Sequence, residues 1–140
     1  MAKHNRRQML NSSLIFFGTI GIVLTFLFQD FSFLNYWSLS EQTEFIVRKA
    51  IRVLLNDVFM LLIIAAWFKD KKVTELAIFI QLLDGFILLP FYLLLKLHFE
   101  GNSEISSPLL SQLHRLIINP TLMILLIPAV YYQKYSAKEK

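Results

Sequence analysis

The sequence predicts an all-α integral membrane protein with four transmembrane helices and both termini in the cytoplasm. Composition, four apolar stretches and the placement of basic residues together predict this fold. Hydrophobic residues make up 56% of the 140-residue chain, charged residues only 17%, and mean hydropathy is +0.54. A soluble domain usually carries about 25% charged residues. The deficit indicates that lipid surrounds much of the protein.

Each of the four apolar stretches is long enough to cross a bilayer. About 20 helical residues, rising about 1.5 Å each, span a hydrocarbon core of about 30 Å. Because lipid offers no hydrogen bonds, a spanning segment must satisfy its own backbone groups, which favours helices. We therefore predict one domain, residues 1–140, whose four helices cover about residues 9–28, 47–68, 75–97 and 108–133.

The first predicted helix is free of charge, whereas the next two carry polar residues. The first stretch follows the basic segment MAKHNRRQML, and no small-x-small cleavage site comes after it. We therefore expect a retained signal anchor instead of a cleaved signal peptide. The second stretch contains Arg52, Asn56 and Asp57, and the third contains Asp84.

The fourth predicted helix begins polar and turns apolar from Leu116 onward. Ser107 and Pro108 suit its N-cap and its first helical position. Internal prolines are expected to kink the third and fourth helices, because each removes a backbone hydrogen bond. These prolines are Pro90, Pro120 and Pro128. Asn119, directly before Pro120, is expected to help satisfy the freed carbonyl groups.

The basic residues predict the orientation. Nine of the fourteen Lys and Arg residues fall on one side of the predicted topology: Lys3, Arg6, Arg7, Lys69, Lys71, Lys72, Lys134, Lys138 and Lys140. The positive-inside rule places that side in the cytoplasm. The other five lie at the opposite helix ends, against the rule: Arg48, Lys49, Arg52, Lys96 and Arg115. Lys96 is explained by snorkelling of a long side chain to the interface.

A cluster of polar residues in the non-cytoplasmic half is the predicted functional site. Its members are Arg48, Arg52, Asn56, Asp57, Asp84, His114, Arg115 and Asn119. Arg48, Arg52 and Asn56 are four apart and share a helix face. Counting rises of 1.5 Å places Asp57 and Asp84 about 15 Å deep, near the midplane.

Charged groups at such depth need partners. A charge at the centre of a spanning helix costs at least about 2.5–3.5 kcal/mol. We therefore expect Arg52 to pair with Asp57 or Asp84, and Arg115 with Asp57. The alternative is that these residues only hold the helices together, through polar contacts that average about 0.6 kcal/mol each. The clustering of so many polar groups favours a functional role, including partner binding.

Other chemistries have weaker support. Ser111 and His114 are three residues apart, and Asp57 is expected near them, but the serine lies in no strained elbow. The three histidines are scattered without a metal-binding spacing, so we predict no metal and no cofactor. Four spans without internal repeats are atypical of a transporter. An anion site is more plausible, since arginine suits phosphate or carboxylate groups.

Three segments carry a resemblance to a known family. They are RVLLND, QLLDGFILLPFYLLLKL and EGNSEISSPLLSQLHRLIINPTLMILLIPAVYYQ, from about residue 48 to 133. This part of the chain resembles the small membrane proteins associated with exosortase F in bacteria. Exosortases process proteins that carry a C-terminal sorting signal, and they use a cysteine, which this chain lacks. The resemblance therefore implies an accessory of the sorting system and not the exosortase.

These observations predict a non-catalytic, multi-pass accessory protein of the bacterial inner membrane. Its expected partners are membrane lipid and an exosortase or other membrane protein, with no nucleic acid. The main alternative is a small lipid- or glycolipid-binding or translocating membrane protein. An intramembrane hydrolase that uses His114 with Ser111 or Asp57 is the weaker alternative.

Overall fold

The computed structural model describes residues 2–28, 39–101 and 107–137, and these ranges contain helices but no strand. The helices follow one another as α1 (Ala2–Leu27), α2 (Glu41–Phe68), α3 (Lys71–Leu83), the π-helical turn η2 (Asp84–Leu88), α4 (Leu89–Phe99), α5 (Pro108–Ile118) and α6 (Thr121–Ser136). The chain is therefore all-helical in its described part, as predicted.

Three of the described spans are long and apolar enough to cross a membrane. They are Gln8–Leu27, Glu41–Phe68 and Lys71–Phe99, the last formed by α3, η2 and α4 in continuation. Helices α5 and α6 meet the same test only as a pair, bent by 64° at the break between them. The architecture is that of a multi-pass membrane protein with three spans, or four if the bent pair counts as one.

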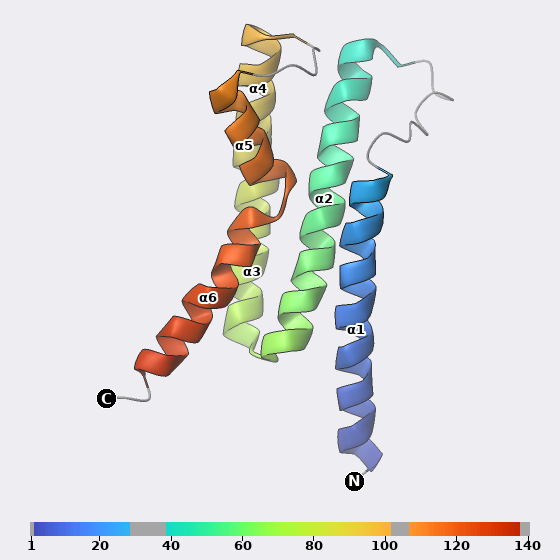
Figure 1. Cartoon of the computed structure of the whole chain (residues 1–140), viewed down its shortest axis with the longest axis vertical. Helices are drawn as coiled ribbons and strands as arrows, with labels where there is room; N and C mark the ends of the chain where they lie inside the picture. Colours follow the sequence, from blue (N-terminus) through green and yellow to red (C-terminus); the bar gives the residue numbers. More distant parts are fainter. Residues whose placement is uncertain (1, 29–38, 102–106, 138–140) are drawn as a thin grey trace.

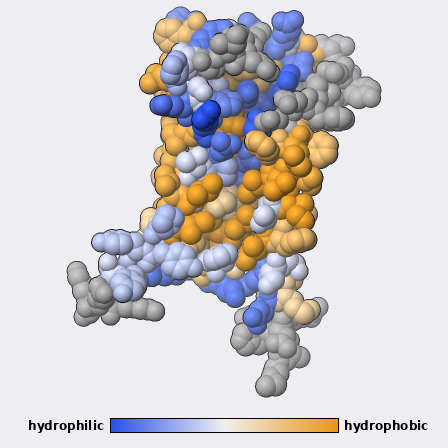
Figure 2. Space-filling view, in the orientation of Figure 1, coloured by the Kyte–Doolittle hydropathy of each residue, from blue (hydrophilic) through white to orange (hydrophobic). Residues whose placement is uncertain are grey.

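The helices run side by side and define two ends of the molecule (Figure 1). At the terminal end, α1 begins, α6 finishes and Lys69–Asp70 joins α2 to α3. At the loop end, α1 and α4 finish while α2 and α5 begin. Helix α1 packs mainly on α2, whereas α5 packs on α4 and α6 on α3. Apolar side chains form a belt between two more polar ends (Figure 2).

Two glycines let α1 approach α2 closely. A Cβ atom on Gly18 would lie 2.9 Å from the backbone oxygen of Phe59, and one on Gly21 would lie 2.4 Å from the Phe59 ring. Phe17 adds an edge-on contact with that ring, at 5.9 Å between centroids. Small residues allow such close helix packing in membranes. No pattern in the sequence predicted this contact.

The third span passes through Pro90 without a break. The backbone N–H of Leu89 donates to Asp84 O, five residues earlier, which is the spacing of a π-turn. Pro90 comes next and has no N–H to donate. One π-helical turn therefore stands directly before this proline, and that turn begins at the buried Asp84.

The fourth predicted helix, residues 108–133, is divided into α5 and α6 at Asn119–Pro120. Ser107 precedes Pro108 at the start of α5 as predicted, although its side chain makes no capping hydrogen bond. At the other end, α6 is fixed to the terminal end of the bundle. Trp67 Nε1 donates to the Tyr131 hydroxyl over 2.8 Å, and Lys134 lies 3.1 Å from the Asp70 carboxylate.

Candidate functional site

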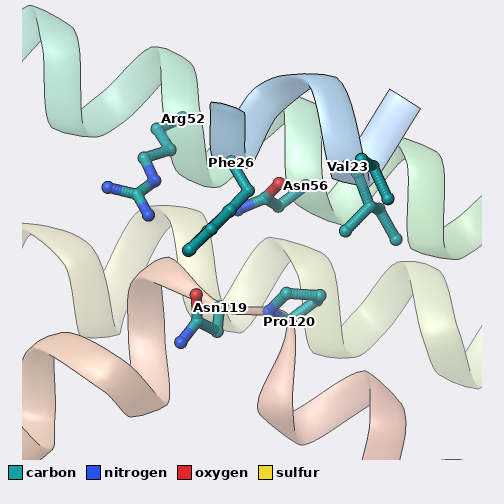
Figure 3. A pocket seen from close by; sticks show the side chains of 7 residues that line it. Val23, Phe26, Arg52, Asn56, Asn119 and Pro120 are labelled. Carbon is teal, nitrogen blue, oxygen red and sulfur yellow. The ribbon is translucent and has the colours of Figure 1, made fainter. Parts of the chain in front are cut away.

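A pocket of about 240 Å³ lies where the α5–α6 break faces α1 and α2. Its apolar wall comes largely from α1, and its polar groups come from α2 and the break (Figure 3). The lining residues are Ile22, Val23, Phe26, Arg52, Asn56, Asn119 and Pro120. Three members of the predicted cluster, Arg52, Asn56 and Asn119, therefore share one cavity.

The break itself explains why the pocket exists. Pro120 cannot donate a backbone hydrogen bond, and Asn119 adopts an extended conformation with φ −86° and ψ 143°. The last carbonyl of α5, on Ile118, accepts a hydrogen bond from Asn56 Nδ2 at 2.8 Å. The Thr121 hydroxyl donates to Arg115 O at 3.2 Å. A polar side chain on α2 thus stabilises the separation of the two helices.

This arrangement differs from the predicted role of Asn119. Its side chain was expected to satisfy carbonyls freed at the proline, but two carbonyls at the end of α5, Ile118 O and Arg115 O, are satisfied by Asn56 and Thr121. Asn119 is exposed and lines the pocket instead. Asn56 is 5% exposed, and its Oδ1 atom has no hydrogen-bond partner. Because Nδ2 must face the Ile118 carbonyl, the amide orientation is fixed and Oδ1 remains an unused acceptor.

A second group of site residues, on α2, α4 and α5, consists of His114 and the cations near it at the loop end. Four of them lie within electrostatic range of His114: Lys49, Arg52, Lys96 and Arg115. The structure thus brings Arg52, His114 and Arg115 together, as the cluster predicts. Arg115 is exposed, and no ion pair of Arg115 occurs among the described residues.

His114 is held by an aromatic partner. Its Nδ1 atom lies 2.9 Å from the hydroxyl of Tyr92, a residue that is 1% exposed. The two rings also meet edge to face, with centroids 5.6 Å apart. Within the described part of the chain, His114 makes no hydrogen bond with Ser111 or Asp57. The three side chains of the hydrolase hypothesis are therefore not assembled into a triad in this structure.

Two cations of the loop end have carboxylate partners one helical turn away. Arg48 pairs with Glu44 at 2.8 Å, and Lys96 pairs with Glu100 at 2.5 Å. Lys96 is only 1% exposed, and its ammonium group reaches Glu100 at the end of α4. The hydrogen bond from Lys96, followed by one from the Ser107 backbone, lowers the pKa of Glu100 to about 2.

The two aspartates form a third group, deeper than the cations. Asp57 and Asp84 are 1% and 2% exposed, and the two carboxyl groups interact electrostatically. One oxygen of each, Oδ1, has no hydrogen-bond partner. The ion pairs described in the structure do not join either aspartate to Arg52 or Arg115, contrary to the predicted pairings.

Tyr92 and Lys96 belong to the site although the sequence analysis left them out of the cluster. They lie four apart on α4, on the face that packs against α5. A tyrosine one turn before a lysine in an apolar helix is the signal that points to a shared polar face.

No group of three His, Asp or Glu side chains in the described ranges is placed to hold a metal ion. Protein-family models, curated proteins and solved structures gave no match to the chain.

Proposed function

We propose that this chain is a non-catalytic accessory protein of an exosortase-type sorting system in the bacterial inner membrane. In this proposal both termini face the cytoplasm. Lys69, Lys71 and Lys72 lie at the terminal end of the bundle, and the positive-inside rule places basic residues on the cytoplasmic side. The loop end then faces the opposite side of the membrane, where a sorted protein and its processing enzyme meet. The exosortase setting rests on the family resemblance of residues 48–133.

The exposure of Arg115 is the observation that supports partner binding. It is exposed, it makes no ion pair among the described residues, and it adds to a cluster that already contains Arg52 and Lys96. Helix packing explains contacts such as that of Asn56 with Ile118 O, but it does not explain an exposed cation at Arg115. An anionic side chain on a membrane partner would complement it, with bidentate geometry available to a carboxylate.

Co-purification with a co-expressed exosortase tests this proposal. Arg115→Gln is expected to reduce both the amount of exosortase recovered and the processing of a sorted protein, while insertion of the chain is unchanged. Lys71→Gln is the matched control, because Lys71 is equally cationic but lies at the terminal end. Normal recovery and processing in Arg115→Gln, or an equal loss in Lys71→Gln, would contradict the proposal.

A further inference from the structure

We propose that the pocket between α1, α2 and the α5–α6 break binds the phosphate group of an anionic membrane phospholipid. This role is independent of the exosortase setting, because it depends only on the pocket. The cavity combines a cation, Arg52, and two amides, Asn56 and Asn119, with an apolar wall (Figure 3). Such a lining fits a ligand with a charged head and a hydrocarbon tail.

The two helix ends at the break are not equivalent toward an anion. A helix C-terminus carries partial negative charge and an N-terminus partial positive charge. Asn56 Nδ2 donates to Ile118 O and so satisfies the negative end of α5. The positive end of α6 begins at Thr121, beside Asn119 and Pro120 of the pocket lining. The first N–H of α6, on Thr121, donates to Asn119 O over 2.6 Å, so the partial positive charge of this end comes from the N–H groups that follow it.

Side-chain groups add to this field independently of the helix end. Arg52 contributes a guanidinium group, whose planar donors suit phosphate oxygens. The loop end carries further cations outside the pocket lining: Lys49 on α2, Lys96 on α4 and Arg115 on α5. Asn56 is 5% exposed and keeps an unused acceptor, Oδ1, which suits a hydroxyl group of the ligand.

The apolar wall identifies the phosphate source as a lipid. Ile22, Val23 and Phe26 come from α1, which packs mainly on α2. Val23 and Phe26 are 50% and 59% exposed, so the same residues line the pocket and face the surrounding lipid. A free phosphate ion would gain nothing from these side chains, whereas an acyl chain would pack on them. Phosphatidylglycerol, with one phosphate and two hydroxyl groups, offers the required chemistry.

Lipid titration with native mass spectrometry tests the proposal on the purified full chain in detergent. The probes are phosphatidylglycerol, the zwitterionic phosphatidylcholine, and inorganic phosphate as a competitor. We expect phosphatidylglycerol to bind at least about tenfold more tightly than phosphatidylcholine, a difference of about 1.4 kcal/mol. Inorganic phosphate at millimolar concentration should not displace it. Equal binding of the two lipids overturns the proposal, and displacement by inorganic phosphate overturns the lipid assignment.

Three variants locate the binding. Arg52→Gln should weaken phosphatidylglycerol binding about tenfold, whereas Arg115→Gln should have little effect because Arg115 does not line the pocket. Val23→Trp should also abolish binding, by filling the cavity without removing any charge. Circular dichroism and monodispersity on gel filtration establish that each variant is folded. Equal losses in Arg52→Gln and Arg115→Gln, or tight binding by folded Val23→Trp, would show that the lipid does not occupy this pocket.

Discussion

Leucine in place of Asn56 removes the hydrogen bond that holds the α5–α6 break against α2. Asn56 Nδ2 donates to Ile118 O over 2.8 Å, and the asparagine is 5% exposed. Leucine has a similar volume, so loss of the hydrogen bond dominates the effect. Because Ile118 ends α5, the break also removes the helical donor that would normally lie four residues later. The variant leaves this carbonyl buried without its partner.

The size of the effect follows from the position of that carbonyl. Hydrogen bonds between membrane helices average about 0.6 kcal/mol, partly because the unfolded state finds other partners. Stranding a buried acceptor costs more, about 1–3 kcal/mol. Ile118 is 1% exposed, so bulk water does not replace the amide. We therefore expect Asn56→Leu to lower the free energy of unfolding by about 1–2 kcal/mol.

Unfolding with sodium dodecyl sulfate from a mild detergent, followed by circular dichroism, measures this difference. Asn119→Leu is the matched control, because Asn119 is exposed and satisfies neither freed carbonyl. Its free energy of unfolding should change by less than about 0.5 kcal/mol. The reasoning is refuted if the two variants are equally destabilised, or if Asn56→Leu is as stable as the parent chain.

Two further predictions concern other contacts. Gly18→Val should separate α1 from α2, since its Cβ would lie 2.9 Å from a backbone oxygen, and should cost about 1–3 kcal/mol. Cross-linking between cysteines introduced into α1 and α2 measures the separation, and a yield equal to that of the exposed control Thr19→Val would contradict it. Glu100 has its pKa lowered from 4.5 to about 2, so its stabilising contribution is complete above pH 4.5 and is lost as pH falls towards 2. The stability difference between the parent and Glu100→Gln should therefore shrink over that window, and a difference independent of pH would argue against the contact.

The helices could be predicted from the sequence because the length and apolar content of a segment are local properties. The effect of Pro120 could not be predicted from its neighbours in the sequence. A proline can kink a helix or end it, and here the outcome depends on Asn56, which is 62 residues from Ile118 in the chain. The sequence instead predicts that the neighbouring Asn119 satisfies the carbonyls, because a sequence pattern relates only nearby residues.

The sequence places the site residues along each helix axis but not around it. Counting residues along each helix placed Asp57 near Arg52, but each helical residue also turns by about 100° around the axis. Asn56 therefore faces the α5–α6 break, whereas Asp57 interacts with Asp84. The predicted pairs with Arg52 and Arg115 failed for this reason. Gly18 and Gly21 were missed because close helix packing is visible only when both helices are in place.

The central claim is that the bent α5–α6 pair crosses the membrane and presents a polar site on the non-cytoplasmic side. The chain has no cysteine, so single cysteines report topology without background. A membrane-impermeant thiol reagent on intact spheroplasts should label Ser107→Cys, at the loop end. It should label Lys69→Cys and Ala137→Cys only after permeabilisation. Labelling of Ala137→Cys in intact spheroplasts would show that α5 and α6 do not cross, and would contradict the claim.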